Sequence, residues 1–146
     1  MTKVAVLLAP GFEEAEAIIT VDILRRLQIE VETLACAESR AVVSYHNIPM
    51  VADSTLTERI NTLYDAAARV LGANGLLKGR RYVCSGDLWQ TVDDGVYVDA
   101  PVVEDNNLIS GKGLGHAFDF ALTLSARLLG DDAPVRDHAE HIYYRW

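Results

Sequence analysis

Acidic side chains crowd the start of the first expected helix, at Glu13, Glu14 and Glu16. A helix N-terminus favours a carboxylate by about 0.3–1 kcal/mol, which would by itself explain such residues there. Three acids so close also repel one another, and a buried one can have a raised pKa and carry a proton. Because these acids follow the apolar run Val4–Ala9 and a glycine turn, we expect Glu16 at the carboxyl edge of a parallel sheet, where open α/β folds bind ligands.

A second candidate for chemistry is the glycine-rich segment Ser110–His116, expected between a strand and a helix. Its amides at Gly113 and Gly115, together with Lys112, could hold a small anion. The segment is not a phosphate P-loop, because no Ser or Thr follows Lys112, and His116 occupies the third glycine position of the dinucleotide fingerprint. The simpler interpretation is a tight turn that lets the helix pack on the sheet, and both interpretations stay open.

The sequence predicts neither a reactive cysteine nor a metal site at the C-terminal histidines. Cys36 and Cys84 each close an expected strand, and neither precedes a strand-to-helix turn that would lower a thiol pKa. We therefore expect both to be unreactive and reduced. His138 and His141 could share a helix face, but the spacing supplies no third ligand, so we predict no metal site and no cofactor.

The elements that must position these residues follow from the apolar pattern. Strands are expected at 4–9, 31–36, 81–84, 96–98, 101–103 and 108–110, a hairpin at 41–45 and 48–52, and helices at 15–27, 55–71, 116–129 and 134–144. Thr55 and Glu58 have the spacing of a capping box, and the apolar stripe that follows them predicts one continuous helix to Leu71. The strand Val4–Ala9 is expected near the centre of the sheet.

Length and charge limit the class of protein. A chain of 146 residues, half of them apolar, predicts a single domain over 1–146. Its net charge of -8 argues against nucleic acid and anionic membranes as partners. The longest apolar run, Val4–Pro10, is too short for a membrane helix, so a cytoplasmic protein is expected.

Segments along most of the chain resemble, in their order, the DJ-1/PfpI (ThiJ-like) superfamily, whose members are glyoxalases, deglycases, chaperones and proteases. The matching segments are 3–16, 20–35, 47–53, 64–65, 68–79 and 108–121. The resemblance implies a flavodoxin-like, class I glutamine amidotransferase-like doubly wound α/β sheet. It implies that Glu16 is the family's conserved acid and that the glycine-rich turn lines the active pocket. It also implies a homodimer, because Arg25 and Arg26 match a basic pair at the family's dimer interface.

One part of the family pattern is absent between Asp65 and Ala68. There the family has a Gly-Gly turn and a strand that ends in the elbow of the nucleophilic cysteine. Without them the chain lacks the thiolate and the oxyanion donors that carbonyl chemistry needs. The main interpretation is therefore a pseudoenzyme whose sheet is shortened by loss of central strands.

Two alternatives to the pseudoenzyme remain. If the gap is not a true deletion, the protein would be a cysteine-dependent deglycase- or glyoxalase-type enzyme. The other alternative is a small-anion binding module at the glycine-rich turn. Across these alternatives, the expected ligand is a small carbonyl compound or an anion.

Overall fold

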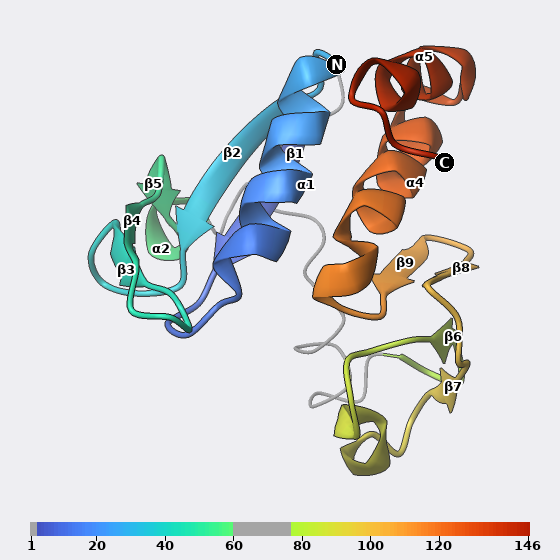
Figure 1. Cartoon of the computed structure of the whole chain (residues 1–146). Helices are drawn as coiled ribbons and strands as arrows, with labels where there is room; N and C mark the ends of the chain where they lie inside the picture. The colour runs from blue at the N-terminus through green and yellow to red at the C-terminus, as the bar shows by residue number, and fades with distance from the viewer. Residues whose placement is uncertain (1–2, 60–76) are drawn as a thin grey trace. The chain divides into compact units, whose positions relative to one another are not determined.

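The computed structural model describes residues 3–59 and 77–146 (Figure 1). The chain divides into two compact units, residues 1–65 and 66–146, each with its own strands and helices. The boundary between them falls where the sequence predicts the missing segment. The expectation of a single domain over 1–146 stays a prediction.

The first unit is built on a strand, a helix and a second strand that runs parallel to the first. Its elements are β1 (Lys3–Leu8), α1 (Glu14–Arg26), β2 (Glu30–Ala35), β3 (Ala41–Val43), β4 (Pro49–Val51), β5 (Ser54–Thr55) and α2 (Leu56–Arg59). β2 pairs in parallel with β1 on one side and with β5 on the other. α1 lies against β1 and β2 and buries Ile23 and Leu24 (Figure 1). The predicted α/β architecture is confirmed here, because apolar strand residues and an amphipathic helix cover each other.

The position of β1 corrects one expectation from the sequence. Among the described strands, β1 lies at the end of the order β1-β2-β5 and not at the centre of the sheet. The expectation assumed a neighbouring strand on each side of Val4–Ala9. The central strands whose loss the sequence predicts are the ones that would fill the second side.

The hairpin predicted after β2 is confirmed, with shorter arms than expected. β3 and β4 are antiparallel, with Val42 opposite Met50, and Asn47 in the turn has a left-handed φ of 61°. Val42 packs with Leu8 and Ala35 in the core of this unit. The hairpin is therefore fixed to the carboxyl end of β1.

The capping box predicted at the start of the next helix is also present. The Thr55 amide donates to Glu58 Oε2 over 2.9 Å, and the Glu58 amide donates to Thr55 Oγ1 over 3.3 Å. These two bonds satisfy backbone donors that a helix start leaves unpaired. The remainder of the helix predicted over 55–71 lies outside the described residues.

The second unit combines short strands with two longer helices. Its elements are β6 (Arg81–Tyr82), the 3-10 helix η2 (Leu88–Thr91), β7 (Val96–Tyr97), β8 (Val102–Asp105), β9 (Leu108–Gly111), the 3-10 helix η3 (Leu114–His116), α4 (Ala117–Leu129) and α5 (Ala133–His141). β6 and β7 are parallel, whereas β8 and β9 form an antiparallel hairpin. Two amides, of Arg81 and Val83, donate to the side chains of Asp105 and Ser110 over 2.7 and 2.9 Å. Side chains thus join β6 to the hairpin.

α4 packs on β9 because a glycine leaves room for it. A Cβ at Gly111 would lie 3.1 Å from Cβ of Phe120, tighter than ordinary contact. α4 ends at Leu129, as the expected helix at 116–129 does, and Gly130 caps it with a left-handed φ of 68°. Among residues 3–59 and 77–146, no helix is long and apolar enough to cross a bilayer.

Candidate functional site

The turn between β1 and α1 places the acidic cluster. Gly11 adopts a φ of 78° in this turn, and Glu13 caps α1 by accepting a 2.7 Å hydrogen bond from the Glu16 amide. The turn is tied to the β3–β4 hairpin, since the Gly11 amide donates to the Val43 carbonyl and the Tyr45 amide donates to the Phe12 carbonyl, both over 2.9 Å. The cluster therefore has a fixed position relative to the hairpin.

The surroundings of Glu16 shift its pKa upward. Its side chain is half-buried, and burial, followed by the negative charge of Glu13, raises its pKa above the ordinary glutamate value. This agrees with the sequence-based argument that one acid of the cluster would titrate high. Catalysis by Glu16 stays a prediction.

Glu14 behaves in the opposite way, although it lies two residues from Glu16. It is only 9% exposed, and its Oε1 lies 2.6 Å from Nδ1 of His46 in the hairpin turn. Burial raises its pKa, but hydrogen bonds from its own backbone amide, from Ser44 and from His46 outweigh burial and leave the pKa lowered. The second oxygen, Oε2, is buried and has no hydrogen-bond partner among the described residues. Sequence reasoning missed His46, because 32 positions separate it from Glu14 and no local spacing signals the contact.

Two polar groups of the glycine-rich turn between β9 and α4 already have partners. Gly113 has φ 141° and ψ -169°, and its carbonyl accepts a 2.9 Å hydrogen bond from the His116 amide. The Lys112 ammonium forms an ion pair with Asp99, and this carboxylate raises the pKa of Lys112. Anion binding through Lys112, Gly113 and Gly115 stays untested, but Lys112 would have to leave Asp99 to take part.

Glu16 belongs to the first unit, whereas the turn Gly113–His116 belongs to the second. The expectations that Glu16 lies at the carboxyl edge of the sheet and that the glycine-rich turn lines the active pocket therefore stay predictions.

Both cysteines are free thiols with reduced acidity. Burial raises the pKa of Cys36, which follows β2. Burial also raises the pKa of Cys84, and a hydrogen bond from the Trp89 backbone amide offsets only part of this. The 3-10 helix η2 after Cys84 was not predicted, because Leu88–Thr91 has no helical apolar repeat. The raised pKa values agree with the expectation that both thiols are unreactive.

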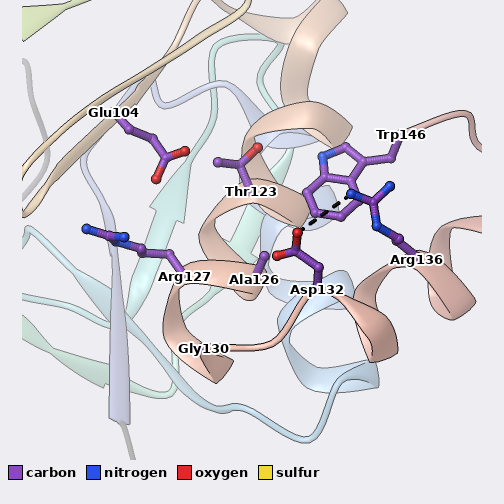
Figure 2. Close-up of a pocket in the computed structure, with 8 residues that line it drawn as sticks. All are labelled: Glu104, Thr123, Ala126, Arg127, Gly130, Asp132, Arg136 and Trp146. Atoms are coloured by element: carbon purple, nitrogen blue, oxygen red, sulfur yellow. Dashed lines mark ion pairs between the residues drawn. The ribbon is translucent and has the colours of Figure 1, made fainter.

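A cavity that the sequence did not indicate lies in the second unit (Figure 2). It has a volume of about 520 Å³ and is lined by Glu104, Thr123, Ala126, Arg127, Gly130, Asp132, Arg136 and Trp146. Arg136 lies 3.6 Å from the Asp132 carboxylate and 5.3 Å from the Trp146 ring centroid. None of the site residues predicted from the sequence lines this cavity, and its charges are of both signs.

The chain is similar to proteins of known family. Residues 2–68 match the DJ-1/PfpI family. The chain is 67% identical in sequence to a DJ-1 superfamily protein from Salmonella typhimurium, whose crystal structure is that of a cysteine-to-alanine mutant. That comparison covers 100% of both chains, with a TM-score of 0.94.

Two further matches come from Drosophila melanogaster. Protein dj-1beta is 28% identical over 173 positions, which cover 90% of this chain and 92% of that protein. The crystal structure of DJ-1beta has a TM-score of 0.85 at 23% identity over 99% of each chain, a likeness of fold alone.

Proposed function

This chain belongs to the DJ-1/PfpI family, and from that premise we propose that it is a pseudoenzyme without cysteine-dependent catalysis. The observation that carries the proposal is the state of its thiols. The whole sequence contains two cysteines, and burial raises the pKa of both. A thiol with a raised pKa is mostly protonated at neutral pH, and the protonated form is a poor nucleophile.

The length of the chain supports the same proposal. Its alignment with the Drosophila dj-1beta protein runs over 173 positions, more than the 146 residues present here. The relative therefore has residues without a counterpart in this chain. From the resemblance to the family we infer that the gap lies between Asp65 and Ala68, where the nucleophile elbow and the oxyanion donors would lie.

A homodimer is part of the proposal, and the β3–β4 hairpin is its best-supported interface. One face of the hairpin carries Ala41, Val43, Pro49 and Val51, all exposed, and Val51 is 70% exposed. When a second copy of the chain covers an apolar face of this kind, the burial lowers the free energy and stabilises the dimer.

The arginine pair that suggested the dimer from the sequence is engaged within the first unit. Arg25 lies 3.0 Å from Asp53, and Arg26 lies 2.7 Å from Asp22.

A cytoplasmic location completes the proposal, because both cysteines are free.

The test is a turnover assay on the purified 146-residue chain, whose intact mass is verified first. Methylglyoxal and a glycated amino acid serve as substrates, and the variants are Cys36→Ala, Cys84→Ala and Glu16→Gln. We expect no substrate consumption above background in any of them, and slow labelling of both cysteines by a thiol reagent at pH 7.

Consumption that is abolished by either cysteine variant would overturn the proposal in favour of a deglycase- or glyoxalase-type enzyme. Consumption that survives both cysteine variants but is lost in Glu16→Gln would also overturn it, because another residue would then act as the nucleophile.

A further inference from the structure

The geometry points to a divalent metal site, best suited to Zn²⁺, formed by Glu13, Glu14 and His46 in the first unit. One ligand atom from each of these residues lies within 4.8 Å of the others. The inference goes beyond the sequence analysis, which predicted no metal site. It is independent of whether the protein is a pseudoenzyme.

A buried oxygen without a partner distinguishes this cluster from an ordinary group of surface acids. Glu14 is 9% exposed, and its Oε2 has no hydrogen-bond partner among residues 3–59 and 77–146. Buried polar atoms are nearly always paired, and an unpaired one is unfavourable. Oε1 is the oxygen that contacts His46, so a cation that binds both carboxylate oxygens of Glu14 would satisfy Oε2.

The donor set selects the class of metal. One imidazole nitrogen and two carboxylates suit Zn²⁺, whereas Ca²⁺ and Mg²⁺ prefer oxygen ligands alone. Glu13 caps α1 through Oε2, which accepts from the Glu16 amide, and a carboxylate has a second oxygen that can coordinate at the same time. Three protein ligands leave a fourth position for water or a small ligand.

The side chains need only a small adjustment. Tetrahedral Zn²⁺ with bonds of about 2.0–2.2 Å separates its ligand atoms by roughly 3.3–3.6 Å. The Glu14–His46 contact of 2.6 Å must therefore open, and the longer separations must close. The His46 side chain is 61% exposed, so its ring can turn without disturbing the core.

The backbone around the cluster is already held in place. The two 2.9 Å hydrogen bonds that join the β1–α1 turn to the hairpin, from Gly11 to Val43 and from Tyr45 to Phe12, do not involve the ligands. A site whose backbone is fixed in advance loses less conformational entropy on binding.

The experiment is a calorimetric titration of the full chain with Zn²⁺ alone, repeated with Co²⁺ to record its visible absorption. The variants are His46→Gln, which removes an exposed ligand, and Glu14→Gln, which preserves side-chain size in the buried position. Far-UV circular dichroism without metal verifies that each variant is folded. His141→Gln is the matched control, because it removes an exposed histidine from α5.

We expect one Zn²⁺ per chain and the absorption of tetrahedral Co²⁺. His46→Gln and Glu14→Gln should each weaken Zn²⁺ binding by more than about tenfold, since loss of an outer-shell partner alone costs 10- to 100-fold. His141→Gln should bind as tightly as the unmodified chain. The site is refuted if the unmodified chain binds no Zn²⁺, if folded His46→Gln binds as tightly, or if only His141→Gln loses binding.

Discussion

The turns β1–α1 and β9–α4 use the same backbone device but differ in how their polar groups are satisfied. Each passes from a strand to a helix through a glycine with positive φ, 78° at Gly11 and 141° at Gly113. Each also lies beside a histidine that contacts a carboxylate, His46 with Glu14 at 2.6 Å and His116 with Asp119 at 3.1 Å. The backbone alone would suggest two equivalent sites.

The partners of the two carboxylates separate the turns. Asp119 uses one oxygen for His116 and the other for the Tyr144 hydroxyl, which lies 2.9 Å away. Glu14 uses one oxygen for His46 and leaves the other buried without a partner among the described residues. In the second turn both carboxylate oxygens have side-chain partners, whereas in the first turn one oxygen has none among the described residues.

The largest effect should come from replacing Gly113 with alanine. Its φ of 141° and ψ of -169° lie in a region that is essentially restricted to glycine. We expect Gly113→Ala to lower the free energy of unfolding by about 1–3 kcal/mol. Chemical denaturation measures the change.

Gly115→Ala is the matched control for Gly113→Ala. A Cβ at Gly115 would meet no atom within 4 Å, and this glycine is not among those with positive φ. The control should leave stability unchanged within about 1 kcal/mol. Equal losses in both variants would mean that the second turn does not depend on the conformation of Gly113.

A smaller effect is expected at Asp119, which joins α4 to the segment that follows α5. Tyr144 stacks on Phe118 with ring centroids 5.1 Å apart, so the hydrogen bond to Asp119 orients a ring that is already packed. Asp119→Ala should lower the free energy of unfolding by about 1–2 kcal/mol, and Tyr144→Phe, which removes one hydrogen bond, by about 0.5–1.5 kcal/mol. Urea denaturation of both variants gives these values. A larger loss of unfolding free energy for Tyr144→Phe than for Asp119→Ala would show that the Asp119 carboxylate is not the group that holds this segment against α4.

Sequence reasoning succeeded where the signal was local. The sequence predicted the strand in the apolar run Val4–Ala9, the capping box of Thr55 and Glu58 and the helix at 116–129. Each depends on residues within a few positions of one another. Periodicity and capping report such short-range preferences directly. The raised pKa of Glu16 also followed from its neighbours in sequence.

The features that could not be predicted depend on contacts between distant segments. The partners of Glu14 and Lys112 come from other elements, His46 in the hairpin turn and Asp99 before β8. The end position of β1 among the described strands likewise depends on which strands pair, and strand order is not encoded in any single strand. The role of each charged residue was therefore harder to predict than its place on a helix or strand.

The last and smallest effect concerns the two acids of the first turn, whose pKa values shift in opposite directions. Burial and Glu13 raise the pKa of Glu16, so ionised Glu16 destabilises the folded state at neutral pH, and this penalty disappears as the pH falls below the unfolded-state pKa. Glu16→Gln should therefore stabilise the protein at pH 7 by a few tenths of a kcal/mol, since the group is half-exposed, with no difference at low pH.

The pKa of Glu14 is lowered, so its ionised form stabilises the folded state. Glu14→Gln should therefore destabilise the protein at pH 7, and this effect should be lost as the pH falls through the folded-state pKa of Glu14. Urea denaturation from pH 7 down to pH 3 in metal-free buffer measures both. Changes of the same sign at pH 7 would contradict the assignment of opposite electrostatic environments to neighbouring acids on one helix turn.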